Sequence, residues 1–282
     1  MSINPIKRFA VIGKPIAHSK SPQIHAQFAR QTGCALQYGK LLAPKDGFAQ
    51  TVAAMRSAGM SGANVTVPFK FEAHALCDVL SKRAMQAGAV NTLSFTDHGI
   101  EGDNTDGAGL VSDLIRLAGP LKDARLLVLG AGGAAAGVLR PLLDEHPQSL
   151  VLLNRTAEKA QALIAALQGD YPQTRLAAGG FNVPAQGVDV IINATSTGLQ
   201  DEAPAIDEHW FAGAKLAYDM MYGAQATAFM REAQTQGVSA HDGLGMLVGQ
   251  AAEAFLIWHG VRPDVSPVLE KLRAQLSPGK TG

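Results

Sequence analysis

A strand, a glycine-rich turn and a helix follow one another without interruption in the middle of the chain, and this junction limits the possible folds more than any other feature. Residues 125–129 (Arg-Leu-Leu-Val-Leu) are almost wholly apolar, as expected for a strand that is buried on both faces of a sheet. They lead directly into Gly130-Ala131-Gly132-Gly133-Ala134-Ala135 and then into a helical apolar pattern that runs to about Asp144. This order predicts a parallel α/β unit.

The spacing Gly130-x-Gly132-x-x-Ala135 within this junction is the fingerprint of a dinucleotide-binding turn. The first glycine permits the tight turn, and the second lets the backbone approach a pyrophosphate. The small third residue lets the helix pack on the strand, and the amino-terminal end of that helix faces the anion. We therefore expect a dinucleotide site at this turn.

The residues after the next strand favour NADP over NAD. A strand over 150–153 ends in Asn154-Arg155-Thr156, and Lys159 follows one turn into the next helix. NAD-binding domains usually carry an acidic residue here, which would repel a 2′-phosphate, whereas a guanidinium and an ammonium attract one. In the alternative interpretation, Asn154 and Thr156 cap the helix and Arg155 is solvated.

Two separate alternations of strands and helices predict a two-domain α/β protein. The first alternation predicts strands at 8–12, 36–42 and 63–67, helices at 22–31 and 47–58, and a hairpin over 90–95 with its turn at 97–99. The hairpin gives this mostly parallel sheet mixed edges. The second alternation adds strands at 150–153, 188–192 and 215–218, and helices at 157–167 and 225–236. We place the boundary between the two within a helix over 106–118.

The carboxyl-terminal part of the chain is predicted to be helical. One helix carries an apolar stripe with the i, i+3, i+4, i+7 spacing, made by Leu244, Leu247, Val248, Ala251, Phe255 and Trp258. A short helix begins at about Ser266. We expect residues 107–242 to form a Rossmann-like domain, with a cleft between it and the first domain that closes by a hinge.

Composition excludes several classes of protein. Lys and Arg together number 24, as do Asp and Glu, so the neutral chain has no electrostatic footprint for nucleic acid or an anionic membrane. No stretch approaches the roughly 20 apolar residues of a membrane span, and no signal peptide is evident, so we expect a soluble, cytoplasmic protein. Neither the two cysteines nor the histidines have metal-ligand spacing, so we expect no metal; these residues include Cys34, Cys77, His18, His25, His74 and His241.

Three polar clusters stand where strands or helices of the first half end: Ser19-Lys20-Ser21-Pro22, residues 64–70, and Asn91 with Asn104-Thr105-Asp106. Each has a structural alternative. Ser21 could be a helix N-cap followed by proline, Lys70 could be a surface lysine, and Asp106 could cap the next helix.

Taken together, the clusters resemble the shikimate dehydrogenase family over essentially the whole chain. The matching strings are residues 13–22 (GKPIAHSKSP), 64–70 (NVTVPFK), 88–93 (GAVNTL), 102–107 (GDNTDG), 130–135, 154–156, 193–198 (NATSTG) and 242–250 (DGLGMLVGQ). The sequence departs from the family pattern at Ala136, where many members have arginine after the glycine-rich turn.

The resemblance implies reversible, NADP-dependent reduction of 3-dehydroshikimate to shikimate, a step toward chorismate and the aromatic amino acids. It makes Lys70 and Asp106 the catalytic pair. It also makes residues 1–106 together with 243–282 the substrate domain, because the carboxyl-terminal helices of the family fold return to pack on the first domain. The implied contacts to the substrate carboxylate are Ser19, Ser21 and Tyr222, and those to the ring hydroxyls, beside the catalytic pair, are Thr66, Asn91 and Gln250. The implied cofactor contacts are Gly130, Ala131, Gly132, Gly133 and Ala134 at the pyrophosphate, Asn154, Arg155, Thr156 and Lys159 at the adenosine phosphate, and Met220 and Gly243 at the nicotinamide.

The residue types suit this chemistry, because a polyhydroxylated acid needs many neutral donors and acceptors. The Lys70 ammonium can stabilise the developing alkoxide and protonate it, while Asp106 orients the lysine. A quinate/shikimate dehydrogenase with NAD is one alternative, and a nucleotide-binding module without turnover is another. Arg155 disfavours NAD, and the Lys70–Asp106 pair disfavours a module without turnover. A monomer and a homodimer both remain open.

Overall fold

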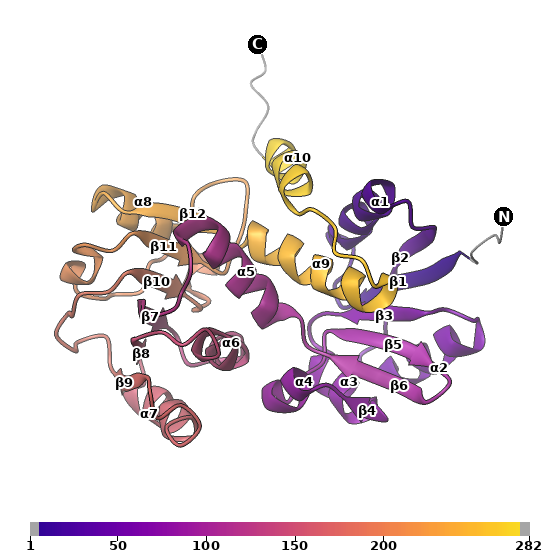
Figure 1. The fold of residues 1–282 in the computed structure, drawn as a ribbon, viewed down its shortest axis with the longest axis horizontal. Coiled ribbons are helices and arrows are strands. Elements are labelled where there is room, and N and C mark those ends of the chain that lie inside the picture. The colour runs from indigo at the N-terminus through magenta and orange to yellow at the C-terminus, as the bar shows by residue number, and fades with distance from the viewer. Residues whose placement is uncertain (1–5, 277–282) are drawn as a thin grey trace, which may run out of the picture. The chain divides into compact units, whose positions relative to one another are not determined.

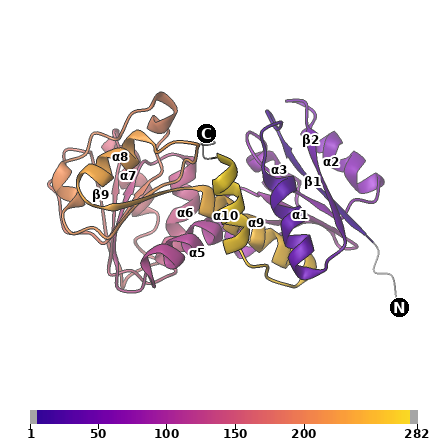
Figure 2. The same ribbon diagram turned by 90° about the horizontal axis from the view of Figure 1, so that it is seen from above.

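The structure is a computed structural model that describes residues 6–276. The chain forms two compact units: residues up to Gly109 together with Val248–Val268 make the first, and Leu110–Leu247 together with the chain from Leu269 make the second. It passes between them inside three helices, α5 (Asp106–Ala118), α9 (Leu244–His259) and α10 (Ser266–Leu276). The elements can be followed in Figures 1 and 2.

The first unit contains a mixed six-stranded sheet in the order β2-β1-β3-β5-β6-β4. Its strands are β1 (Lys7–Gly13), β2 (Leu36–Leu42), β3 (Gly62–Val65), β4 (Val79–Leu80), β5 (Thr92–Thr96) and β6 (Gly99–Asp103). Strand β5 alone runs antiparallel to its neighbours β3 and β6, and the other pairings are parallel. The sheet is therefore mixed as expected, but the reversal lies inside it and not at its edges, because β6 pairs in parallel with the unforeseen β4.

Alternating residues of β1 point to opposite faces of this sheet and define two layers. Ala10 and Ile12 pack with the helices α2 (Phe48–Ser57), α3 (Lys70–Leu76) and α4 (Lys82–Ala87). Phe9 packs on the opposite face, where its ring stacks on Trp258 of α9 at 4.2 Å between centroids. The indole of Trp258 donates to the Leu93 carbonyl at 3.2 Å, so the carboxyl-terminal half of α9 belongs to this core together with α1 (Ser21–Thr32).

The second unit contains a fully parallel sheet in the order β12-β11-β10-β7-β8-β9. Its strands are β7 (Arg125–Leu129), β8 (Ser149–Leu153), β9 (Arg175–Gly179), β10 (Val190–Asn193), β11 (Leu216–Asp219) and β12 (Ser239–Asp242). Numbered within the unit, this order is 3-2-1-4-5-6, that of a Rossmann fold, whose crevice opens between β7 and β10. The predicted fold class is confirmed.

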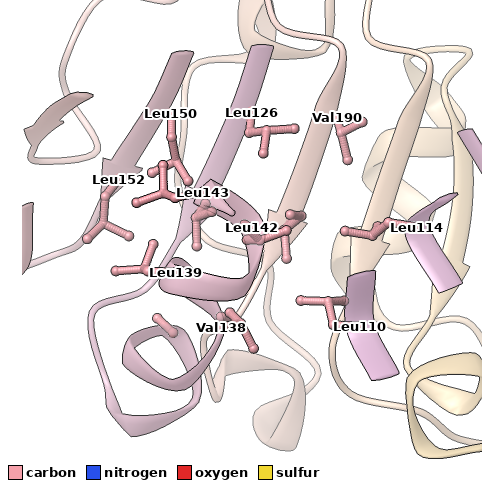
Figure 3. Close-up of a cluster of buried hydrophobic side chains, with 14 of the residues drawn as sticks. Leu110, Leu114, Leu126, Val138, Leu139, Leu142, Leu143, Leu150, Leu152 and Val190 are labelled. Carbon is pink, nitrogen blue, oxygen red and sulfur yellow. The ribbon is translucent and has the colours of Figure 1, made fainter. Parts of the chain in front are cut away.

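The apolar strand β7 is buried on both faces. Leu126 packs with α5 and with α6 (Gly133–Leu143), as Figure 3 shows. Val128 belongs to the same cluster. Leu127 and Leu129 pack on the other face with η2 (Glu208–Phe211) and α8 (Ala228–Thr235). The remaining helical elements are α7 (Ala157–Ala165) and η1 (Thr197–Gln200). Within residues 6–276, no helix has the length and apolar character to cross a bilayer.

Helix α10 groups with the second unit from Leu269, whereas we expected it with the first domain. Its Arg273 guanidinium contacts the Asp242 carboxylate at the end of β12. This ion pair joins charged residues of elements that are distant in the chain, and the family resemblance on which the expectation rested carries no information about it.

Candidate active site

The Lys70 and Asp106 side chains meet in the first unit. Lys70 is the first residue of α3 and Asp106 the first residue of α5, and the ammonium Nζ lies 2.5 Å from the carboxylate Oδ2. Both side chains are about three-quarters buried, with 29% and 24% exposed. The structural alternatives are therefore wrong: Lys70 is no free surface lysine, and Asp106 stands inside the helix and not at its cap. The partial positive charge at the start of α5 stabilises the carboxylate there.

Asn91 holds the second oxygen of the same carboxylate. Its side chain is buried, and Nδ2 donates to Asp106 Oδ1 at 2.8 Å and to Thr105 Oγ1 at 2.9 Å. Its Oδ1 accepts from the Thr105 backbone N–H at 2.9 Å. Both carboxylate oxygens of Asp106 thus have partners, which determines the direction from which the Lys70 ammonium is held.

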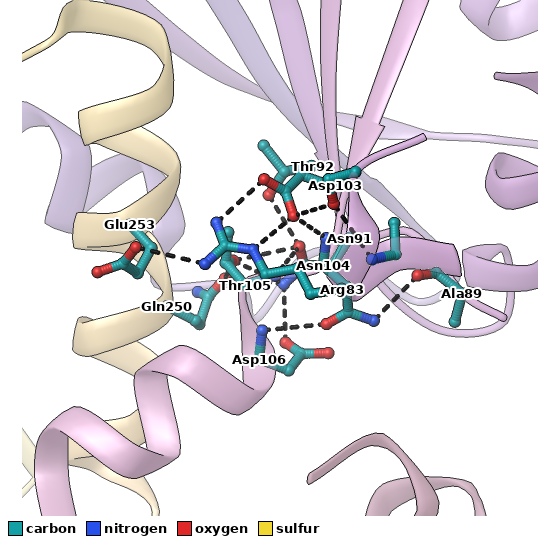
Figure 4. A network of polar contacts seen from close by, with 12 residues as sticks. Arg83, Ala89, Asn91, Thr92, Asp103, Asn104, Thr105, Asp106, Gln250 and Glu253 are labelled. Atoms are coloured by element: carbon teal, nitrogen blue, oxygen red, sulfur yellow. Dashed lines mark hydrogen bonds and ion pairs between the residues drawn. The ribbon is translucent and has the colours of Figure 1, made fainter. Parts of the chain in front are cut away.

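Gln250 reaches the same cluster from α9 (Figure 4). Its Oε1 accepts long hydrogen bonds from Asn91 Nδ2 at 3.4 Å and from Thr105 Oγ1 at 3.5 Å. The half-buried Gln250 side chain lies off the buried stripe of α9, as its helical position predicts.

Ser19 and Ser21 lie together at the start of α1. The Ser19 hydroxyl donates to the Ser21 hydroxyl at 3.2 Å and accepts from the Ser21 backbone N–H at 3.3 Å. Lys20 occupies the N-cap position and Ser21 is the first helical residue, so the interpretation of Ser21 as an N-cap is wrong. Thr66, half-buried, follows β3 and pairs through its backbone N–H with the Ile12 carbonyl at 2.9 Å.

Sequence reasoning assigned no role to Tyr38 and Asn64, which the structure joins. The Tyr38 hydroxyl donates to Asn64 Oδ1 at 2.6 Å, and Asn64 Nδ2 donates to the Asn91 carbonyl at 3.2 Å and to Thr92 Oγ1 at 3.1 Å. Asn64 is the first residue of the string 64–70, and its place in that string could have predicted a role in the site. Tyr38 lies on β2, and no sequence motif around it predicted such a role.

A pocket of about 770 Å³ opens in the second unit at the carboxyl ends of β7, β8 and β10. Its lining includes nine residues predicted at the cofactor: Gly130, Ala131, Gly132, Gly133, Ala134, Asn154, Arg155, Thr156 and Lys159. The lining residues that sequence reasoning left without a role are Phe181, Ala194, Thr195, Ser196, Thr197, Gln200 and Glu202. Four of these unassigned lining residues lie in the string 193–198, which matches the family but was given no function from the sequence.

The glycines of the turn have different functions. Gly130 has φ of +102°, a backbone conformation that demands glycine, and a Cβ there would lie 3.1 Å from the Ala194 carbonyl, which leaves little room for a side chain. A Cβ on Gly132, the N-cap of α6, would meet nothing within 4 Å, so the backbone there is open to a ligand. Ala135 is fully buried in the core against the sheet.

The end of β8 presents positive charge to this pocket. Asn154 Oδ1 accepts from the Ala131 backbone N–H at 3.1 Å, which connects β8 to the glycine turn. Thr156 is the N-cap residue of α7, but its side chain accepts no capping hydrogen bond. Within the described part of the chain, the exposed side chains of Arg155 and Lys159 have no ion-pair partner. An open backbone at a helix start beside two free cations fits a dinucleotide that carries an additional phosphate.

Three family models match successive parts of the chain. They are described as the shikimate dehydrogenase substrate binding domain (residues 11–93), shikimate / quinate 5-dehydrogenase (residues 114–211) and the shikimate 5'-dehydrogenase C-terminal domain (residues 243–273). A curated relative from Aromatoleum aromaticum, named shikimate dehydrogenase (NADP(+)), is 55% identical over 97% of this chain and 99% of its own. The chain belongs to the shikimate dehydrogenase family.

Solved structures agree with this membership of the shikimate dehydrogenase family. The chain is similar to an Ael1 enzyme from Pseudomonas putida, with a TM-score of 0.89 and 42% identity over 97% of this chain and 99% of the other. It is also similar to shikimate 5-dehydrogenase from Thermus thermophilus in complex with NADP(H) and shikimate, with a TM-score of 0.82 and 34% identity over 96% of this chain and all of the other.

Three residues of the second unit that the shikimate dehydrogenase pattern implies lie outside the pocket lining given above. Met220 and Gly243 touch each other, because a Cβ on Gly243 would fall on the Met220 carbonyl oxygen. Tyr222 is 38% exposed on the loop after β11. Tyr222 belongs to the second unit and the two serines belong to the first, so its part in holding a carboxylate stays a prediction.

The histidines that the structure describes do not form a metal-binding site with other side chains. Across residues 6–276, no group of three or more His, Cys, Asp or Glu side chains could hold an ion. His25 is fully buried, and burial lowers its pKa to about 3. Its ring lies parallel to that of Tyr38, with 4.2 Å between centroids, so it contributes to the core as a neutral aromatic group.

Proposed function

We propose that this chain catalyses the reversible NADPH-dependent reduction of 3-dehydroshikimate to shikimate, a step toward chorismate and the aromatic amino acids. The observation that carries the proposal is the contact of 2.5 Å between the Lys70 ammonium and the Asp106 carboxylate. It accompanies a pocket in the second unit whose glycines and cations suit NADP. The names of the curated relatives support the same activity.

In this mechanism the protein supplies the proton and orients the group that donates it. A bound reduced nicotinamide supplies a hydride to the carbonyl carbon of the substrate. The Lys70 ammonium donates a hydrogen bond to the carbonyl oxygen and transfers its proton as negative charge develops there. Asp106 orients that ammonium because its other oxygen is held by Asn91. The reaction requires the nicotinamide held by the second unit to reach the carbonyl held by the first.

The substrate is a small polyhydroxylated acid, and the polar groups of the first unit suit it. Ser19 and Ser21 bind its carboxylate with help from Tyr222 of the second unit. Thr66, Asn91 and Gln250 bind ring hydroxyls together with the catalytic pair. Hydroxyl and amide groups at matching positions reject analogues strongly, because a missing substrate hydroxyl leaves a buried protein group unpaired.

On the cofactor side, Gly130 to Ala134 bind the pyrophosphate and Met220 and Gly243 border the nicotinamide. The adenosine end is bound by Asn154, Arg155, Thr156 and Lys159, and the two cations among them select the 2′-phosphate.

Arg155→Ala should raise the KM for NADPH about tenfold and leave the KM for NADH unchanged, since only NADPH carries the charge that the guanidinium binds. Arg175→Ala, at another exposed arginine of the same unit outside the pocket lining, is the control. An unchanged KM for NADPH in Arg155→Ala would refute the role of this residue.

The deciding experiment follows the oxidation of NADPH by the purified protein with 3-dehydroshikimate. Turnover that depends on both compounds supports the proposal, and its absence from folded protein that binds NADPH would support a module without turnover. The family model over residues 114–211 names quinate beside shikimate, so quinate with NAD+ is assayed in parallel. The extra hydroxyl of quinate crowds the carboxylate end of the site near Ser19, and we expect a kcat/KM at least tenfold below that for shikimate with NADP+.

Three further properties belong to this proposal. The partners are small molecules, without nucleic acid or membrane, and the protein is a monomer or a homodimer. The protein works in the cytoplasm, where two free thiols, Cys34 and Cys77, persist in reduced form.

A further inference from the structure

Arg83 has none of the roles assigned above, yet its guanidinium contacts two acidic side chains of the first unit (Figure 4). Its Nε and Nη2 donate to the two carboxylate oxygens of Asp103 at 2.6 and 3.0 Å. Its Nη1 lies 3.5 Å from Oε2 of Glu253. A planar guanidinium can hold two carboxylates at once in set directions, which an ammonium cannot do. One side chain of α4 is thus bound both to the end of β6 and to α9.

The contact with Asp103 leads to the catalytic carboxylate. Asp103 is the last residue of β6, and its Oδ1 also accepts from the Asn104 backbone N–H at 2.6 Å and from the Ser81 hydroxyl at 2.7 Å. Asn104 in turn accepts from the Asp106 backbone N–H at 3.1 Å through its Oδ1. The place where α5 begins, and with it the Asp106 carboxylate, therefore depends on how Asp103 is held.

The contact with Glu253 leads to the substrate amide. Glu253 follows Gln250 by three residues on α9, so the two side chains lie on neighbouring parts of one helix face. The Glu253 side chain is only 11% exposed, and its other oxygen contacts Arg262. A small rotation of α9 that separates Glu253 from Arg83 also moves Gln250 relative to Asn91.

We propose that Arg83 is a positioning residue for the reaction: by holding Asp103 and Glu253 together, it sets the Asn104–Asp106 turn against Gln250. This inference rests on the proposed function, because it concerns the geometry of that site. Arg83 acts through Asp106 and Gln250 and makes no contact with substrate. The two contacts serve different steps, since Gln250 binds substrate and Asp106 orients the proton donor.

The test compares Arg83→Ala, Arg83→Lys and Glu253→Gln with a matched control, Arg125→Ala. Arg125 forms a bidentate pair with Asp189 in the second unit, with side chains 40% and 18% exposed against 33% and 18% for Arg83 and Asp103. We expect Glu253→Gln to raise the KM for 3-dehydroshikimate about threefold at constant kcat. Arg83→Ala should raise that KM and also lower kcat, for a loss in kcat/KM of about thirtyfold, and Arg83→Lys should lie between this variant and the wild type.

A double-mutant cycle separates positioning from general stability. If Arg83 acts through Gln250, adding Arg83→Ala to Gln250→Ala raises the KM by less than it does in the wild type. Full additivity of the two changes in KM, or steady-state constants in Arg83→Ala that match those of Arg125→Ala, would overturn the inference. The melting temperature of each variant is measured alongside, and Glu253→Gln retains a test should Arg83→Ala fail to fold. An inactive wild type would instead contradict the proposed function.

Discussion

Lys70 owes its place to the start of a short helix, and its ammonium has a carboxylate partner that is itself held by an amide. Lys70→Ala should lower kcat by a factor of about a hundred to ten thousand with little change in the KM for 3-dehydroshikimate, because proton transfer is an interaction of the transition state. Steady-state kinetics at saturating NADPH provide the measurement. Lys82→Ala is the control, since Lys82 is an exposed lysine that also opens a short helix. Turnover at the wild-type rate without Lys70 would remove it from the mechanism.

His25 makes stability depend on pH. Burial lowers its pKa to about 3, whereas the unfolded chain takes up this proton at about pH 6.5. Between these values the unfolded state binds more protons, so the free energy of unfolding falls as the pH falls below 6.5. This group contributes about 2 kcal/mol of that loss between pH 7.5 and pH 5.

His25→Phe preserves an aromatic ring at this place and should remove that part of the pH dependence, which urea unfolding at the two pH values measures. The variant gives up an interaction of the His25 ring with the Asn64 side chain, which keeps its hydrogen bonds to Tyr38, the Asn91 carbonyl and Thr92. His259, whose pKa burial lowers to about 4, contributes with the same sign and stays in both proteins. The exposed His98 gives the control His98→Phe, which should retain the wild-type slope. An equal slope in His25→Phe would contradict this account.

At the scale of elements, the junction of β7 and α6 needs glycine at two positions for different reasons: Gly130 for its backbone conformation and Gly132 for the approach of the ligand. Gly130→Ala should lower the free energy of unfolding by about 1–3 kcal/mol, because a side chain is strained at a φ of +102°. Gly132→Ala has room in the folded chain and should cost about 1 kcal/mol or less, while weakening NADPH binding at least tenfold by occupying the place of the pyrophosphate. Urea unfolding and fluorescence titration with NADPH measure the two effects. Tight binding in Gly132→Ala would show that the pyrophosphate lies elsewhere.

Elements with strong apolar periodicity were predictable, and the short ones were not. β7, β8 and α9 combine runs or stripes of large apolar residues, and each was located to within a few residues. β9 and β12 were missed, because each is a short, partly exposed strand at an edge of its sheet, where few large apolar residues are needed. α3, β4 and α4 were missed because each is too short to show a period and is held in place by neighbours in the first unit.

At the scale of the whole molecule, two units with separate cores suggest separate ligand responses. We expect NADP+ alone to slow amide hydrogen exchange at 130–134 and 154–159, and shikimate alone to slow it at 64–70 and 104–106, since bound ligand stabilises the segments that it contacts. Hydrogen–deuterium exchange with mass spectrometry resolves these segments. Protection of both sets by shikimate alone would contradict the assignment of substrate to the first unit and of nucleotide to the second.

The sequence by itself determined the local features of this protein. Gly130, Gly132 and Ala135 define a dinucleotide turn because backbone conformation and close approach restrict the residue types there. Arg155 and Lys159 indicate the cofactor because charge at the end of one strand needs no distant partner to be interpreted. The strings around Lys70 and Asp106 indicated the family because each is a run of consecutive residues that can be recognised without knowing its distant contacts.

Only the tertiary structure decided which distant side chains meet. Lys70 and Asp106 are far apart in the chain and 2.5 Å apart in space. The long hydrogen bonds to Gln250, the bridge made by Arg83 and the pairing of Arg273 with Asp242 have no local signal at all. The physical reason is that hydrogen bonds and ion pairs depend on directions and distances of a few ångströms, which the packing of whole sheets and helices sets and which no periodicity along the chain encodes.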